Sequence, residues 1–404
     1  MDALTALYQD LHRNPELSFA EERTARIAAD HLRATGYEVF EQVGRTGVVG
    51  ILRNGEGPVV LLRADMDALP VREDTGLPYS STATARDANG VEVAVMHACG
   101  HDVHVACLIR AATELSEMRS EWTGTLVALF QPAEELGIGA QAMIDDGLYS
   151  KVPLPDVVLG QHVGPAPAGA VGAHPGPAFA SNNSVNITVY GRGGHGSRPE
   201  TTIDPIVLGA TIVTRLQTII AREIAPQETA VVTVGRFLAG TKNNIIPGQA
   251  TLGLNIRAYS ERTRAQILDA VTRIVLGEAA ASGAPEPLIE HTESLPATVN
   301  DPGATARINA EFESRFGRDA LLAPGAVSGS EDVGLLATEA GAPLAYWILG
   351  GTDAELFAEA ARNDSLERDI PSNHSPHFAP VLDPTLRRGV DALVTAAQSY
   401  LQRH

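Results

Sequence analysis

The alternation of short apolar runs with helical stretches is the feature that most constrains the fold of this chain. Runs rich in β-branched residues predict strands at 37–42, 48–53, 59–63, 125–130 and 157–160. Helices are expected at 101–119 and 139–146, and after a capping box at Ser18 to Glu21, where Gly36 closes the helix. Strands alternating with helices indicate a mostly parallel sheet covered by helices, so we predict an α/β fold.

Polar side chains follow three of these strands directly. They are Asp65 and Asp67 after 59–63, Glu134 and Glu135 after 125–130, and His162 after 157–160. The carboxyl ends of parallel strands meet at one edge of a sheet, and open α/β sheets bind ligands in the crevice there. We therefore expect these side chains to converge.

The rhythm of strands and helices changes after about residue 183. Strands at 185–190, 229–237, 249–258 and 287–292, with helices at 204–222 and 261–281, follow the order β-α-β-β-α-β. This order is the split unit of a ferredoxin-like α+β domain. A chain of 404 residues exceeds the size at which one core stops growing, so two domains are expected.

The α+β domain is predicted to be an insertion. The first domain is expected over 1–180 and the inserted domain over 181–293. The first domain then resumes over 294–404, with a helix at 301–316, a strand at 345–349 and a closing helix at 385–402. The Pro- and Gly-rich stretch 164–177 is interpreted as a surface connection at the border.

Charge and composition exclude several kinds of partner. A formal net charge of −19 disfavours nonspecific binding to nucleic acid or to an anionic membrane surface. No apolar run approaches the roughly 20 residues that span a bilayer, and no signal-peptide pattern is seen. The two cysteines, Cys99 and Cys107, form no disulfide framework and suit a reducing compartment. We expect a soluble, cytoplasmic protein that acts on a small molecule.

Five side chains have the chemistry of metal ligands: Cys99, His101, Glu135, His162 and His374. Thiolate, imidazole and carboxylate are the ligand types of a zinc-like ion. Cys99 and His101 are expected on a loop just before a helix, because positions two apart on a helix point to different faces. Glu134 and Glu135 share a crowded crevice, so we assign Glu135 as a ligand and Glu134 as a general base.

These ligands, with Asp65 and Asp67 nearby, exceed the four-coordinate demand of one zinc ion. Two divalent ions that share a bridging ligand are the simpler interpretation. Either Cys99 or a carboxylate can serve as the bridge. Thiolate and imidazole favour zinc, whereas carboxylates also admit manganese or cobalt, and nickel is a further alternative.

Each motif taken alone has a simpler structural interpretation. An isolated Cys-x-His pair is more often a buried cysteine beside a hydrogen-bonded histidine. A Glu-Glu pair can be the solvated start of a helix, and a lone histidine at a strand end is usually structural. The metal site is favoured because all of these motifs occur together in one chain.

Several segments, in the right order, resemble the M20 metallopeptidase family. They are Leu11 to Leu17, Arg63 to Pro70, Met96 to His104, Gln131 to Glu135, His162-Val163 and His374 to Pro376. More narrowly, they resemble its amidohydrolase branch, which includes hippurate hydrolases and auxin-conjugate hydrolases. The resemblance implies a zinc-peptidase-like catalytic domain and a two-metal amide hydrolase. Its ligands would be the five residues named above, with Glu134 as base and Asp67 orienting the site.

The resemblance also implies that the inserted domain is a lid or dimerisation domain of a homodimer. Gly191 to Gly196 matches its glycine motif, in which His195 would reach the active site of a partner subunit and polarise the scissile carbonyl. From the residues alone, His195 would be an exposed histidine in a glycine hairpin.

Asn244 and Arg257 resemble family positions that hold the carboxylate of the substrate. An arginine fork matches a carboxylate, although a surface ion pair is an equally good interpretation of Arg257. The chain departs from many relatives at Asn255-Ile256, before this arginine, and at Val333. Those departures concern the shape of the pocket rather than the metal chemistry.

The predicted function is metal-dependent cleavage of an N-acyl amino acid to a carboxylic acid and a free amino acid. A dipeptidase or metallocarboxypeptidase of the same family is the alternative. A cysteine hydrolase that uses Cys99 and His101 would leave the other ligands unexplained. A metal-binding protein without catalysis would leave Glu134 and His195 unexplained.

Overall fold

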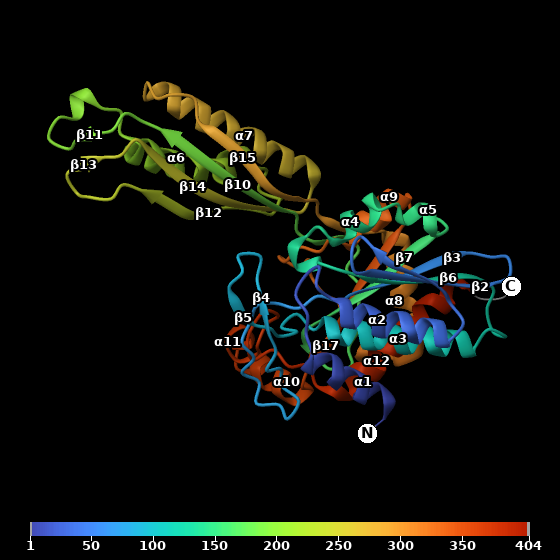
Figure 1. Cartoon of the computed structure of the whole chain (residues 1–404). Coiled ribbons are helices and arrows are strands. Elements are labelled where there is room, and N and C mark those ends of the chain that lie inside the picture. The colour runs from blue at the N-terminus through green and yellow to red at the C-terminus, as the bar shows by residue number, and fades with distance from the viewer. Residues whose placement is uncertain (1, 402–404) are drawn as a thin grey trace. The chain divides into compact units, whose positions relative to one another are not determined.

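A computed structural model describes residues 2–401 of the chain (Figure 1). The chain forms two compact units. Unit 1 comprises Met1–Ala178, Val299–Gly325 and Asp332–His404, and unit 2 comprises Phe179–Thr298 and Ala326–Glu331. Short strands β9 (Gly176–Phe179) and β16 (Thr298–Asn300) lie where the chain passes from one unit to the other. Among the described helices, none is both long and apolar enough to cross a membrane.

A seven-stranded sheet forms the centre of unit 1, in the order β1-β2-β6-β3-β7-β17-β8. In that order the strands are Glu38–Val43, Gly47–Asn54, Gly124–Gln131, Val59–Asp65, Val157–Pro167, Leu344–Thr352 and Val171–Gly172. The four neighbours β6, β3, β7 and β17 run parallel, whereas β1, β2 and β8 pair antiparallel at the two edges. The predicted α/β fold with a mostly parallel sheet is confirmed.

Helices cover both faces of this sheet (Figure 1). On one face lie α1 (Ala3–Arg13), α2 (Glu22–Ala34), α3 (His101–Glu117), α8 (Pro302–Phe316) and α12 (Leu382–Leu401). On the other lie α4 (Gly139–Asp145) and α9 (Val333–Ala340). Helix α3 is buried along most of its length because small and aliphatic residues occupy nearly all of its faces. It therefore forms the middle of the core, next to β3 and α12.

The remaining elements of unit 1 are short. They are β4 (Thr84–Arg86), β5 (Glu92–Ala94), α5 (Leu148–Lys151), α10 (Ala354–Arg362) and α11 (Leu366–Asp369), with 3-10 turns η1 (Glu134–Leu136) and η4 (Arg318–Ala320). Strands β4 and β5 form a hairpin of their own. Of these pieces only η1 contributes residues of the predicted site.

Unit 2 has the predicted β-α-β-β-α-β order. Its antiparallel sheet runs β12 (Ala230–Ala239), β14 (Gln249–Ala258), β10 (Asn182–Tyr190), β15 (Leu288–Leu295). Helices α6 (Pro205–Thr218) and α7 (Glu261–Ala281) pack on it, and α6 continues into a π-helical turn, η3 (Ile219–Glu223). Alternate residues of β10 and β14 are buried in a separate core, so one face of the sheet carries the helices. Strands β11 (Gly194–His195) and β13 (Ile245–Ile246) form a small antiparallel ribbon. Strand β11 contacts the 3-10 turn η2 (Pro199–Thr201).

The predicted capping box at Ser18 to Glu21 is wrong. Helix α2 begins at Glu22, and the Ser18 hydroxyl donates instead to Asp67 Oδ2 at 2.7 Å. The Glu21 carboxylate accepts hydrogen bonds from the backbone N–H groups of Phe19 and Ala133, both at 2.9 Å. These side chains connect loops around the candidate site, and that use outweighs the local capping pattern.

Two further expectations are corrected at β7 and α3. Strand β7 continues to Pro167, so His162 lies inside the strand, opposite Ile348 of β17, and not after its end. The stretch 164–177, expected to be a surface connection, contains the end of β7 and all of β8, because buried Val171 pairs with β17. His101 is the first residue of α3 and does not precede the helix.

Candidate metal centre

The carboxyl ends of the parallel strands bring the predicted residues to one edge of the sheet. Arg63 of β3 is level with Gly160 of β7, so Asp65, two residues on, reaches the level of His162. Asp65 is also level with Gln131, the last residue of β6, from which the chain enters η1. Helix α3 starts at the same edge after Gly100, whose φ of 81° is accessible to glycine at little cost.

The five predicted ligands and Glu134 lie together. In each of three overlapping groups, one ligand atom per residue lies within 4.8 Å of the others: Cys99, His101 and His162; Cys99, Glu135 and His374; His101, Glu134 and Glu135. Cys99 Sγ is 3.5 Å from His162 Nε2, and His374 Nε2 is 3.3 Å from Glu135 Oε2. Cys99, His101 and Glu135 each belong to two groups; of these, the Cys99 thiolate and the Glu135 carboxylate have the chemistry of a bridging ligand.

Two atoms of this cluster indicate that it accommodates a cation. Among the described residues, His101 Nε2 and Glu135 Oε1 are buried without a hydrogen-bond partner. A buried polar atom without a partner costs about 1–3 kcal/mol, so such atoms are rare unless a ligand satisfies them. An imidazole nitrogen and a carboxylate oxygen beside a thiol are the donor set of a divalent transition metal. The residues present therefore fit the predicted metals.

Neighbouring groups orient these ligands. Asp67 Oδ1 lies 3.2 Å from His101 Nδ1, which leaves Nε2 of that ring facing the cluster. Asp67 Oδ2 accepts hydrogen bonds from Ser18 Oγ and from the backbone N–H of Glu135, at 2.7 and 3.0 Å. The His162 Nδ1–H donates to the backbone oxygen of Val163 at 2.8 Å, again leaving Nε2 for a ligand role. Such contacts fix the tautomer and direction of a ligating histidine.

Burial shifts the pKa values of two of these groups, His162 and Cys99. It lowers the pKa of His162 to about 4, so the ring is neutral at pH 7, as a metal ligand must be. Burial, followed by the charge of Glu135, raises the pKa of the Cys99 thiol. A divalent cation has the opposite effect on a thiol, because it stabilises the thiolate.

Two residues of the site were missed at the sequence level, His104 and Arg63. The His104 Nδ1–H donates to Asp65 Oδ1 at 2.5 Å, and His104 Nε2 accepts from the backbone N–H of Val163 at 2.8 Å. Its spacing was the available signal, because positions three apart on a helix share a face and His104 follows His101 by three. For Arg63 the signal was an arginine within a buried apolar strand, two residues before an aspartate.

A third missed residue, His12, links α1 to α3. His12 Nδ1 lies 2.6 Å from Asp102 Oδ2, and His12 Nε2 lies 3.1 Å from Glu73 Oε1. Burial alone would lower the pKa of His12, but hydrogen bonds to the two carboxylates outweigh it and raise that pKa to about 9. His12 is therefore a buried imidazolium that holds the first helix against the helix carrying His101.

The other predicted site residues belong to unit 2. His195, on β11, is exposed, and its Nδ1 accepts hydrogen bonds from Ser197 Oγ and the Ser197 N–H at 2.7 and 3.1 Å. Asn244 adjoins it, because the Gly196 N–H donates to the Asn244 backbone oxygen at 2.8 Å. Arg257 is separate from both: it lies eight residues along β14 from Gln249, roughly 27 Å for an extended strand.

Arg257 has partners within unit 2. Its guanidinium donates to Ser330 Oγ at 2.6 Å and to Asn255 Oδ1 at 3.0 Å. The alternative interpretation of Arg257 was a surface ion pair. The structure instead shows its guanidinium bonded to two neutral acceptors. An arginine bonded to neutral groups keeps its charge available for a carboxylate.

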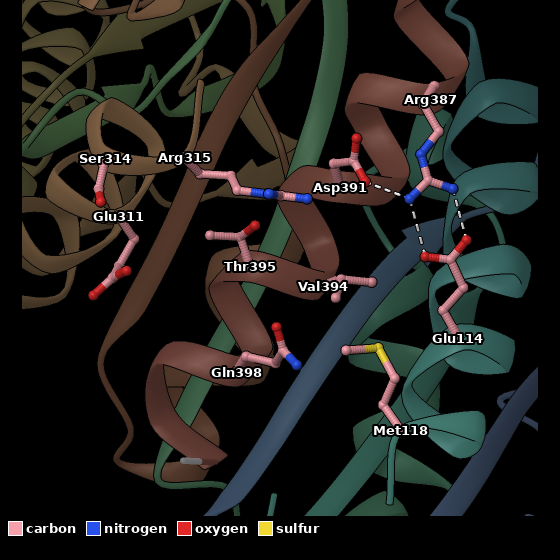
Figure 2. Close-up of a pocket in the computed structure, with 10 residues that line it drawn as sticks. All are labelled: Glu114, Met118, Glu311, Ser314, Arg315, Arg387, Asp391, Val394, Thr395 and Gln398. Carbon is pink, nitrogen blue, oxygen red and sulfur yellow. Dashed lines mark hydrogen bonds and ion pairs between the residues drawn. The ribbon is translucent and has the colours of Figure 1, made fainter. Parts of the chain in front are cut away.

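A cavity of about 570 Å³ lies elsewhere in unit 1, between residues of α3, α8 and α12 (Figure 2). There Arg387 donates to both oxygens of Glu114, at 2.7 and 3.1 Å, and also pairs with Asp391 (Figure 2). None of the ten residues that line the cavity is a histidine or cysteine, and Glu114 is already neutralised by Arg387. This cavity is not a candidate metal centre.

Comparisons with known proteins show which proteins this chain resembles. The model of peptidase family M20/M25/M40 matches residues 61–398. The hippurate hydrolase of Campylobacter jejuni subsp. jejuni serotype O:2 is 41% identical over 309 residues, 76% of this chain and 77% of that protein. Thermostable carboxypeptidase 2 of Saccharolobus solfataricus is 38% identical over 312 residues, 76% of each protein. A solved structure of the YXEP protein of Bacillus subtilis, a dinuclear metal binding peptidase from the M20 family, is also similar. It has a TM-score of 0.77 and 29% sequence identity, and the match covers 98% of this chain and 97% of that one.

Proposed function

This chain belongs to peptidase family M20/M25/M40, and we propose that it hydrolyses the amide bond of N-acyl amino acids to a carboxylic acid and a free amino acid. The observation that carries the proposal is the convergence of five metal-ligand side chains beside Glu134. The similarity to a hippurate hydrolase supports the N-acyl amino acid class of substrate. The similarity to a carboxypeptidase keeps peptides as the second candidate class.

Two divalent ions are proposed at the cluster, held by Cys99, His101, Glu135, His162 and His374. Zinc is the first expectation, with manganese, cobalt and nickel as alternatives. When bound, such ions lower the pKa of water and polarise a carbonyl group. The similarity to a dinuclear peptidase supports the number of ions.

Glu134 is proposed as the general base and acid. It is a buried residue of η1, and its Oε2 lies 3.8 Å from His101 Nε2. Glu134 accepts a proton as the water oxygen bonds to the amide carbon. The same proton then goes to the leaving nitrogen as the C–N bond breaks, so one carboxylate serves both halves of the reaction.

His195 is proposed to stabilise the oxyanion. Its Nδ1 accepts hydrogen bonds from Ser197, so in the neutral ring the proton is on Nε2. An Nε2–H group is a donor suited to a carbonyl oxygen that gains negative charge. The local hydrogen bonds thus select the tautomer that this role needs.

We propose that the protein is a homodimer whose active site takes residues from two copies. His195 and Asn244 lie at the β13 end of unit 2, and Arg257 lies far along β14 from them. One copy of unit 2 therefore cannot place all three around one small substrate. Edge strand β12 carries the exposed residues Val231 (50%) and Leu238 (61%), and such an edge can pair with a second copy.

The test of the base is the Glu134→Ala variant. We expect its activity on N-acetyl and N-benzoyl amino acids to fall at least roughly 100-fold, because the proton acceptor is lost. Its metal content per subunit, measured by elemental analysis, should stay at the wild-type value. Glu121→Ala removes an exposed carboxylate and serves as the matched control, with both quantities unchanged.

Three outcomes would contradict the proposal. Near wild-type turnover by Glu134→Ala would remove that residue from the chemistry. Activity of chelator-treated, metal-free wild type would refute metal dependence. Faster hydrolysis of dipeptides with a free α-amino group than of N-acyl amino acids would transfer the assignment to a peptidase.

A further inference from the structure

A buried chain of hydrogen bonds lies behind the predicted ligands. It begins at Arg63, whose Nη1 donates to Asp65 Oδ2 at 2.7 Å. The other oxygen of Asp65 accepts the Nδ1–H of His104 at 2.5 Å. On its far side, His104 Nε2 accepts the backbone N–H of Val163 at 2.8 Å. All three of these side chains are at most 1% exposed, so water does not compete for the bonds.

Arg63, the first residue of this hydrogen-bond series, is held rigidly. Besides Asp65, the Arg63 guanidinium donates to Gln131 Oε1, Tyr346 Oη and Asp332 Oδ1, at 3.0, 3.1 and 3.3 Å. Asp332 is fixed in turn by the Gln131 side chain at 2.6 Å and the Ala140 backbone at 2.9 Å. A guanidinium with partners on all its edges cannot change rotamer without breaking several bonds.

The last hydrogen bonds of this series orient the His162 ring. The Val163 N–H is held by His104, and the Val163 carbonyl oxygen accepts from His162 Nδ1 at 2.8 Å and from Asn373 Nδ2 at 3.0 Å. The peptide groups of Val163 are therefore fixed from both sides. A fixed Val163 carbonyl sets the direction of the His162 ring and leaves its Nε2 toward Cys99.

His104 also lies against two of the predicted ligand rings. It stacks on His101 with ring centroids 5.4 Å apart and meets His162 edge to face at 4.7 Å. Its hydrogen bonds in opposite directions, a donor at Nδ1 and an acceptor at Nε2, require the neutral Nδ1–H tautomer. Because both nitrogens of His104 are bonded and only one tautomer fits those bonds, the ring has a single orientation. The His101 and His162 rings pack against it in that orientation.

We propose that His104 is a positioning residue for the metal centre: the chain from Arg63 through Asp65 and His104 to Val163 fixes the His101 and His162 rings for the ions. This inference deepens the proposed function and rests on its metal centre. His104 does not bind the ions itself, since both of its nitrogens are already used. Its effect is measured as the affinity of the metal-free protein for the metal.

The experiment titrates Zn²⁺ into chelator-treated full-length protein in competition with a chromophoric chelator. His104→Phe keeps an aromatic ring and removes both hydrogen bonds, and we expect at least one of the two ions to bind roughly 10–100-fold more weakly. His104→Gln keeps an acceptor for the Val163 N–H and should recover part of that loss. Cys107→Ala, on the same buried helix and hydrogen-bonded to the Leu386 backbone, is the matched control and should retain wild-type affinity.

A spectroscopic measurement on the wild type makes the test independent of the folding of the variants. The ¹⁵N shifts of the metal-free, histidine-labelled protein should show His104 as a neutral ring protonated at Nδ1. A charged ring or the Nε2–H tautomer would overturn the inference, and so would wild-type zinc affinity in folded His104→Phe. If the wild type itself binds no zinc, the proposed function fails; if the wild type binds and His104→Phe binds equally, only this inference fails.

Discussion

At the scale of single residues, the charge of His12 is held far from water. Asp102 and Glu73 each face one of its ring nitrogens, so both nitrogens donate only when the ring is protonated. The same contacts act on the partner carboxylate. Burial alone would raise the pKa of Glu73, but the His12 and Thr75 hydrogen bonds lower it to about 2. The pair is therefore ionised throughout the neutral range.

The stability of the protein should depend on pH through this pair. The pKa of His12 rises from 6.5 to about 9 on folding, so its contribution is complete below pH 6.5 and is lost as pH rises through 9. The pKa of Glu73 falls from 4.5 to about 2, so its contribution is complete above pH 4.5 and is lost as pH falls through 2. The His12 shift corresponds to roughly 3 kcal/mol of unfolding free energy.

Thermal unfolding of wild type and His12→Gln from pH 5 to pH 10 measures this contribution. We expect the wild type to unfold at the higher temperature near pH 6, and the difference between the two proteins to shrink as pH rises toward 9 and beyond. His31→Gln changes an exposed histidine and controls for the loss of an imidazole. A difference that stays constant over this range would show that His12 is not charged in the folded protein.

At the scale of elements, the start of α3 matters for the candidate metal centre because His101 is its first residue, and Gly100 sets where the helix begins. A Cβ atom at Gly100 would lie 2.4 Å from Val163 Cγ1 and 3.3 Å from Phe378 Cε1. Its φ of +81° is also unfavourable for any residue with a Cβ atom. A side chain there would displace either the start of α3, with His101, or the β7 residue that follows His162.

Gly100→Ala is therefore expected to lower both stability and zinc content. The left-handed backbone alone costs roughly 1–2 kcal/mol, and the contact with Val163 adds to it. Gly90→Ala is the matched control, because Gly90 has a φ of +76° and no atom near its Cβ position. Thermal unfolding and elemental analysis of both variants separate the two effects. Equal losses in the two variants would mean that the Val163 contact has no influence.

Local patterns predicted the elements well where they needed no distant partner. Helix α7 begins and ends at the predicted residues, because Ser260 caps it through the Thr263 N–H and its buried face repeats with helical spacing. The capping box at Ser18 failed because Asp67 competes for the serine hydroxyl. The hydrogen bond between His104 and Val163 could not be predicted, because the two residues are 59 positions apart and spacing carries no information over that separation.

Sequence patterns identified which residues lie at the candidate site better than they predicted where the fold places them. The five proposed ligands and Glu134 could be named because each belongs to a recognisable motif, and the structure brings their side chains together. The position of His162 inside β7 could not, since the pairing of β7 with β17 depends on a segment nearly 200 residues later. The separation of Arg257 from Asn244 likewise could not be predicted, because it depends on the extended course of β14.

At the scale of the whole molecule, the assignment of His195 to a partner's active site is open to a direct test. His195→Ala and Glu134→Ala subunits are each expected to form inactive homodimers. In a mixed dimer, one of the two sites combines an intact Glu134 with an intact His195 from the other copy. Co-expression of the two variants should therefore restore roughly a quarter of wild-type activity, if the subunits pair at random.

Sedimentation must show that the co-expressed sample is dimeric, and mass spectrometry must show that it contains both variants. Activity near a quarter of wild type would then support a site shared between subunits. An inactive mixture of verified mixed dimers would contradict the shared site. Full activity of the His195→Ala homodimer would remove this histidine from the reaction altogether.

The scattering of the site along the chain has a consequence for biosynthesis. Cys99 and Glu135 emerge from the ribosome early, the whole of unit 2 follows, and only then does His374 appear. A nascent chain halted before that last histidine can present some of the donors but never the complete set. If the ligands are those proposed, tight metal binding therefore waits until the segment that carries His374 has docked on unit 1.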